Sequence, residues 1–152
     1  MAIEKGLGYK NLLEEKGEIS FVPSGNSMWP TLKNRKQTVV VQKKVERLNV
    51  FDVALFEKDG VIVLHRVMEV TANGYVTCGD SQLKSETVLE TDVIGVLKGF
   101  YKGKKFVPIT DKKHIKKVQS WYKRKSFRKF RIKLFYLGLR IKTKLNKIFK
   151  KG

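Results

Sequence analysis

The chain has 152 residues, which supports one core domain plus an appendage. Its formal net charge of +19 is concentrated at one end: residues 111–152 hold 17 Lys/Arg and one acid, whereas residues 1–110 hold 16 Lys/Arg and 13 acids. The single cysteine, Cys78, excludes an intrachain disulfide, and one cysteine with two histidines disfavours a structural zinc site, which needs about four ligands. We therefore expect neither a metal nor another cofactor.

The first 110 residues have the pattern of a mainly β domain. Residues 3–16 predict a short helix that ends at Gly17. Asp59-Gly60 and Asn73-Gly74 are strong hairpin signals, and Lys102-Gly103 marks a third turn. The expected strands cover residues 19–22, 38–41, 50–56, 61–70, 75–78, 93–97 and 106–109. Short strands separated by turn signals at this spacing predict an antiparallel barrel or sandwich over residues 1–110.

Residues 111–152 predict a basic amphipathic helical tail. From about Lys112, apolar residues recur at steps of three and four, and lysine and arginine fill much of the rest. This composition is typical of a helix that lies in the interface of an anionic membrane. The expected membrane-binding residues are Trp121, Phe127, Arg128, Phe130, Arg131, Leu134 and Leu137. Packing on the β domain, a protein partner and nucleic acid remain alternatives, the last disfavoured because no helix-turn-helix precedes the strands.

Ser27 and His65 are the candidate catalytic residues. Ser27 lies in a glycine-containing turn bounded by prolines, residues 23–31 (PSGNSMWPT), in which Gly25, Asn26 and Met28 flank the hydroxyl and provide backbone N–H groups for an oxyanion. His65 lies in an apolar strand, and its pKa near neutrality suits a general base. A third group usually orients such a histidine, and the candidates are Asp80 first, then Glu86 and Asp92.

Several segments, in order, resemble the signal peptidase I and SOS-repressor serine peptidase superfamily. They are SGNSMWPTL at 24–32, NVFDVALF at 49–56, LHRV at 64–67, GDS at 79–81 and IGV at 94–96. The resemblance implies a coiled β-barrel or sandwich of the signal-peptidase type, with Ser27 as the nucleophile and His65 as the base. Since a lysine fills the position of His65 in the bacterial branch, this chain resembles the Ser-His branch, whose acid would be Asp80 or Glu86.

The chain departs from the family pattern at three places. Gly25 stands where many bacterial signal peptidases have a serine that assists the oxyanion, and Phe51 stands where a glycine is usual. Residues 1–20 contain no apolar stretch that could act as a secretory signal or an anchor. The chain therefore resembles an anchorless bacterial subgroup, located in the cytoplasm or on the inner face of the cytoplasmic membrane.

Two functions remain open at this stage. The first is a serine endopeptidase that cleaves a peptide or protein precursor at the cytoplasmic membrane surface. The alternative is a non-catalytic binding module on the same β fold, tethered to a membrane or nucleic acid by the basic tail.

Overall fold

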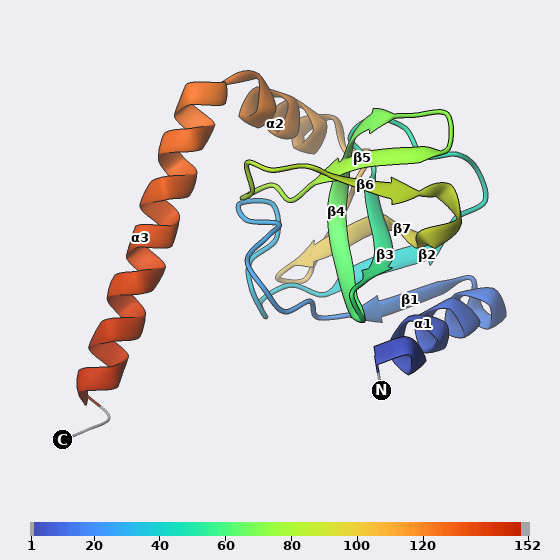
Figure 1. Cartoon of the computed structure of the whole chain (residues 1–152), viewed down its shortest axis with the longest axis horizontal. Helices are drawn as coiled ribbons and strands as arrows, with labels where there is room; N and C mark the ends of the chain where they lie inside the picture. Colours follow the sequence, from blue (N-terminus) through green and yellow to red (C-terminus); the bar gives the residue numbers. More distant parts are fainter. Residues whose placement is uncertain (1, 150–152) are drawn as a thin grey trace. The chain divides into compact units, whose positions relative to one another are not determined.

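The structure of the chain, a computed structural model, describes residues 2–149 and the side chains of residues 8–147 (Figure 1). Three helices, one short 3-10 helix and eight strands follow one another along this part of the chain. They are α1 (Ala2–Lys16), β1 (Glu18–Phe21), β2 (Val39–Lys43), β3 (Val53–Lys58), β4 (Val61–Val70), β5 (Gly74–Cys78), β6 (Glu86–Leu89), η1 (Glu90–Asp92), β7 (Val93–Lys102), β8 (Lys105–Pro108), α2 (Lys112–Lys123) and α3 (Lys125–Phe149).

The strands form one antiparallel sheet in the order β1-β2-β7-β3-β4-β5-β6, with β8 paired to β7. All three predicted hairpins are confirmed: β3–β4, β4–β5 and β7–β8. Asp59 and Gly60 both have positive φ angles, 49° and 74°, as the two central residues of a tight right-twisted hairpin require. A mainly β fold with an N-terminal helix and C-terminal helices is therefore confirmed.

Three details differ from the sequence prediction. The strand expected from Val50 begins only at Val53, because Phe51 lies in the left-handed region with φ 79°. Strand β6 was not predicted; its alternating pattern is weak because only Val88 of its four residues is buried. The tail forms two helices, α2 and α3, rather than one.

Strand β3 lies at the centre of the core because both of its faces are buried. Val53 and Leu55 belong to one apolar cluster, and Ala54 and Phe56 belong to another. Since successive strand residues point to opposite faces, the two clusters lie on opposite faces of β3. Helix α1 contributes Leu13 to the first of these clusters.

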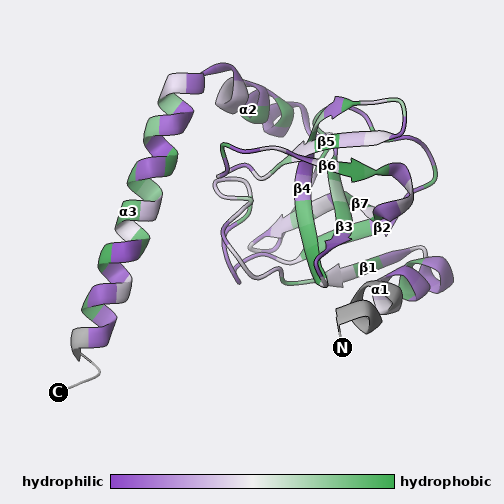
Figure 2. Cartoon of the chain, in the orientation of Figure 1, coloured by the Kyte–Doolittle hydropathy of each residue, from purple (hydrophilic) through white to green (hydrophobic). Residues whose placement is uncertain are grey.

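The chain divides into two compact units, residues 1–118 and 119–152. The first contains all the strands and the second contains α3. Figure 2 shows apolar residues gathered along β3 and β4, whereas apolar and polar residues are interspersed along α3.

Candidate active site

Ser27 lies in a compact turn between β1 and β2. The Trp29 N–H donates to the carbonyl oxygen of Asn26 at 3.0 Å, and the Leu32 N–H donates to that of Met28 at 2.8 Å. Gly25 has φ 109°, a conformation that favours glycine, and its N–H donates to Asn34 Oδ1 at 3.0 Å. Because Met28 is buried in the core while Ser27 is half-buried, the turn holds the Ser27 side chain at the surface of the core.

His65 lies in β4, where it pairs with Ala54 of β3. The residue is buried, 5% exposed, and its ring packs edge-on against Phe56 with 6.0 Å between the ring centroids. Its Nδ1 atom forms a hydrogen bond with the Glu86 carboxylate. That hydrogen bond leaves Nε2 as the ring atom that can accept a proton when the imidazole is neutral.

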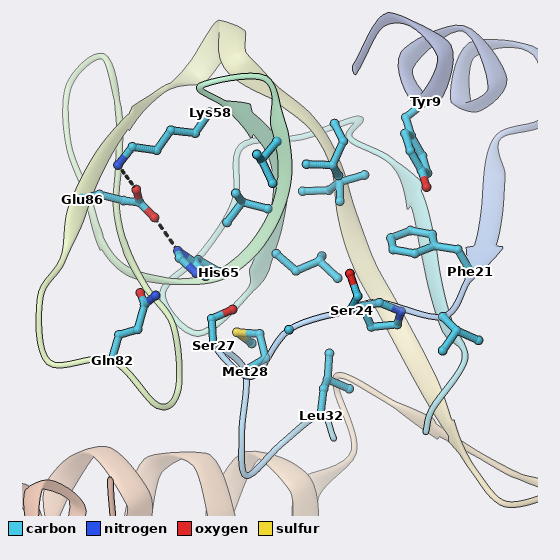
Figure 3. Close-up of a pocket in the computed structure, with 18 of the residues that line it drawn as sticks. Tyr9, Phe21, Ser24, Ser27, Met28, Leu32, Lys58, His65, Gln82 and Glu86 are labelled. Atoms are coloured by element: carbon cyan, nitrogen blue, oxygen red, sulfur yellow. Dashed lines mark hydrogen bonds and ion pairs between the residues drawn. The ribbon is translucent and has the colours of Figure 1, made fainter. Parts of the chain in front are cut away.

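Glu86 lies between two cationic or potentially cationic partners. One oxygen contacts His65, and the other accepts a hydrogen bond from the Lys58 ammonium group at the end of β3. Figure 3 shows Lys58, Glu86 and His65 in a row beside the pocket. Lys58 therefore fixes the carboxylate that orients the histidine.

Ser27, His65, Glu86 and Lys58 line the same pocket, which has a volume of about 600 Å³. Figure 3 shows the Ser27 side chain next to His65 in this view, with Ser24 and Phe21 farther along the pocket. Within the described part of the chain, the Ser27 hydroxyl makes no hydrogen bond, and the backbone N–H groups of Ser27 and Met28 donate none. The apolar part of the wall includes Tyr9, Phe21, Met28, Leu32, Leu55, Ile62 and Leu64.

Asp80 has a different role from Glu86. Its two oxygens accept hydrogen bonds from Arg66 Nε and Nη2, both at 2.8 Å, and it also accepts one from the Thr31 hydroxyl. The side chains of Arg66 and Asp80 are each 1% exposed. Arg66 Nη1 donates to the carbonyl oxygen of Phe51 at 2.9 Å. This buried cluster joins the serine turn, the segment before β3, strand β4 and the segment after β5.

Gly79 and Ser81 hold the backbone of Ser27 from the other side. The Ser81 N–H donates to the Ser27 carbonyl oxygen at 2.8 Å, and its hydroxyl donates to the carbonyl oxygens of Asn26 at 2.7 Å and Ser27 at 3.1 Å. A Cβ atom on Gly79 would lie 2.7 Å from the Ser27 carbonyl oxygen. Position 79 therefore requires glycine, because the two segments approach too closely for a side chain.

The structure brings some predicted residues together and separates others. Ser27, His65 and Glu86 share one pocket, whereas Asp80 is held by Arg66, and Asp92 is exposed in η1. Sequence reasoning missed Lys58 and the binding role of Arg66. Both pair with residues distant in the sequence, and no short motif marks either pairing.

The predicted membrane-binding residues also separate into two groups. Phe127, Phe130, Leu134 and Leu137 are exposed on α3, and Arg131 is exposed beside them. Trp121 is half-buried, and the Arg128 guanidinium lies over the Tyr122 ring, 4.5 Å from its centroid.

The pKa of His65 is expected to lie below its usual value of 6.5. Burial lowers this pKa, and the hydrogen bond and charge of Glu86 raise it only in part. The imidazole is therefore neutral at pH 7. Burial raises the pKa of Glu86, but the hydrogen bonds from Lys58 and His65 outweigh it and lower the pKa overall, which keeps Glu86 ionised.

An NMR titration of the histidine side chains tests this balance. We expect His65 to titrate with a midpoint below 6.5, and Glu86→Gln to move the midpoint to still lower pH, because the substitution removes the group that raises it. The chain has only two histidines, so His114→Gln assigns the signals. A midpoint above 6.5, or an upward shift in Glu86→Gln, contradicts the expectation.

Replacing Gly79 by alanine is expected to displace the serine turn. The added methyl group would overlap the Ser27 carbonyl oxygen, so the two segments would have to separate, at a cost of about 1 to 3 kcal/mol in stability. The measurement is the thermal unfolding midpoint. Gly8→Ala is the control, because nothing lies within 4 Å of its added Cβ atom. A Gly79→Ala protein that unfolds at the wild-type midpoint would contradict this role.

Comparison of the chain with protein-family models and with curated proteins finds no match. Among the described residues, no group of three or more His, Cys, Asp or Glu side chains could hold a metal ion. Within the same part of the chain, no helix has the length and apolar character needed to cross a membrane.

Proposed function

We propose that the protein is a serine endopeptidase of the signal-peptidase type that cleaves a peptide or protein precursor. The observation that carries this proposal is the pocket shared by Ser27, His65 and Glu86, with a neutral histidine held by a carboxylate. The fold that goes with it is the coiled β-barrel of the signal peptidase I and SOS-repressor superfamily, in its Ser-His branch.

The buried cluster supports this family assignment. Four residues of this cluster come from four different segments that resemble the superfamily. They meet around one ion pair, and they are Thr31, Phe51, Arg66 and Asp80. Phe51 stands where the family usually has a glycine, and it adopts φ 79°, a left-handed conformation that favours glycine.

The proposed reaction has two steps and requires no cofactor. His65 Nε2 takes the proton of the Ser27 hydroxyl as Oγ attacks the scissile carbonyl carbon, and the oxyanion binds backbone N–H groups of the turn. The imidazolium then gives its proton to the leaving amine as the C–N bond breaks, which forms an ester on Ser27. Water, deprotonated by His65, attacks the ester, and its hydrolysis releases the acid and restores the serine.

An unpaired strand edge supports a peptide as the substrate. Residues 61–65 of β4 pair with β3 on one side, but β5 pairs only with residues 66–70. In the described part of the chain, no strand covers the other edge of residues 61–65, and all five residues line the pocket. An extended peptide can add to such an edge through main-chain hydrogen bonds, which would place its carbonyl groups beside Ser27.

We place the enzyme in the cytoplasm or on the inner face of the cytoplasmic membrane. The alternative function is a non-catalytic binding module, and Ser27 forms no hydrogen bond with His65 in the described residues. Catalytic hydrogen bonds are often long before substrate binds, so this geometry is compatible with both functions.

Cleavage of a diverse peptide library, followed by mass spectrometry, decides between the two functions. We expect new termini at a defined sequence with the wild-type protein and none with Ser27→Ala. Peptides that co-purify with both proteins and remain intact would instead establish a binding module.

A further inference from the structure

Helix α3 carries an apolar stripe that its own fold leaves exposed. Six side chains, which we call the outer stripe, lie within an arc of about 80° on a helix with 3.6 residues per turn. Their exposed fractions range from 48% to 62%. The outer stripe consists of Phe127, Phe130, Leu134, Leu137, Ile141 and Leu145. Contiguous apolar surface of this kind marks an interaction site.

The outer stripe is distinct from the side of α3 that is shielded from water. Ile132 is 5% exposed, and Phe135 and Leu139 are half-buried. With 100° between successive residues, these three lie roughly opposite the outer stripe. The helix thus has two apolar sides, and only one of them is covered. Figure 2 shows apolar and polar residues along the coloured part of α3.

Cations flank the outer stripe. Lys129, Lys133, Arg140 and Lys144 lie along one border, and Lys142 lies near the other, at the angles that the helix period gives. Residues 119–152 contain thirteen Lys/Arg and no acid. Among the described residues, none of these five cations forms an ion pair. Long basic side chains beside an apolar stripe can extend to the headgroups while the stripe enters the acyl boundary.

We propose that α3 docks in the interface of a bilayer that contains anionic lipids, with the outer stripe in the acyl boundary and the flanking cations on the headgroups. Nucleic acid would bind the same cations but would leave the outer stripe in water. The combination of an exposed apolar stripe with flanking cations therefore favours a membrane. The inference is independent of the peptidase chemistry, because no residue of the outer stripe lines the pocket.

Co-sedimentation of the full chain with vesicles tests the proposal. We expect binding to phosphatidylcholine vesicles that contain phosphatidylglycerol and at least tenfold weaker partitioning into phosphatidylcholine alone. Phe130→Ser with Leu137→Ser should weaken partitioning into the anionic vesicles at least tenfold, because two apolar side chains leave the interface. Leu137→Trp should strengthen it, since tryptophan favours the interface.

A matched pair of charge variants separates this site from general basicity. Lys133→Gln with Lys144→Gln should weaken vesicle binding about 20-fold. Lys104→Gln with Lys105→Gln, an equal change of charge on the exposed β7–β8 hairpin, should alter vesicle binding less than twofold.

Equal losses of vesicle binding in both pairs, or serine variants that bind within twofold of wild type, overturn the proposal. Tighter binding to duplex DNA than to anionic vesicles, insensitive to the serine substitutions, also overturns it and identifies nucleic acid as the partner. Ser27→Ala should bind vesicles as wild type does, which keeps the two proposals separable.

Discussion

Replacing Ser27 by alanine is expected to lower the rate of peptide cleavage by about 10⁴-fold or more, with no loss of folding. The hydroxyl makes no hydrogen bond with other described residues, so its removal leaves no buried partner unsatisfied. Its proposed contribution is the covalent step alone. The measurement is kcat and KM on a peptide from the library screen, beside the urea midpoint of unfolding.

Variants of His65 and Glu86 test whether these residues act together with Ser27. His65→Ala should lose as much activity as Ser27→Ala, and the double variant should be no worse, because the two residues act as one unit. Glu86→Gln should lose less, about 10²-fold to 10⁴-fold, since the base remains but its orientation and charge stabilisation are weakened. Ser20→Ala, an exposed serine outside the pocket, is the control. A Ser27→Ala protein with more than a tenth of the wild-type rate would refute the proposed nucleophile.

Local turn chemistry explains why much of the fold was predictable. Asp59-Gly60 and Gly103 adopt positive φ angles that few other residues accept, so the sequence marks those turns directly. Strand β6 carries no such signal: one buried valine among four residues cannot show a period. The side chain of Phe51 predicts a strand, whereas its backbone is held left-handed by hydrogen bonds to β4. Its N–H donates to the Val67 carbonyl oxygen, and its own carbonyl oxygen accepts from Arg66.

Only those residues of the candidate site that lie in short sequence motifs could be predicted. The turn around Ser27 and the strand around His65 could be recognised, and the structure brings both to one pocket. The roles of the two acids depend on strand register, because Asp80 and Glu86 lie six residues apart and face different partners. No single-sequence pattern distinguishes the acid that holds Arg66 from the acid that orients His65.

Asp80→Ala is expected to destabilise the protein by about 3 to 5 kcal/mol. The substitution leaves the Arg66 guanidinium, 1% exposed, without the carboxylate that accepts two of its hydrogen bonds, and it removes the acceptor of the Thr31 hydroxyl. Urea unfolding followed by tryptophan fluorescence measures the loss. Asp92→Ala is the matched control, because this aspartate is exposed and should change stability by less than about 0.5 kcal/mol.

A double-mutant cycle separates the buried pair from the proposed catalytic acid, Glu86. Arg66→Met should also be strongly destabilising, but Arg66→Met with Asp80→Ala should cost clearly less than the sum of the two, because no charge is then left unpaired in the core. Glu86→Gln should change stability little, since its partner Lys58 remains half-exposed to water. Additive losses at positions 66 and 80 would mean that each side chain acts through its other contacts. A large fall in stability for Glu86→Gln would mean that Glu86 has the structural role assigned to Asp80. It would also contradict the proposed role of Glu86 in orienting His65.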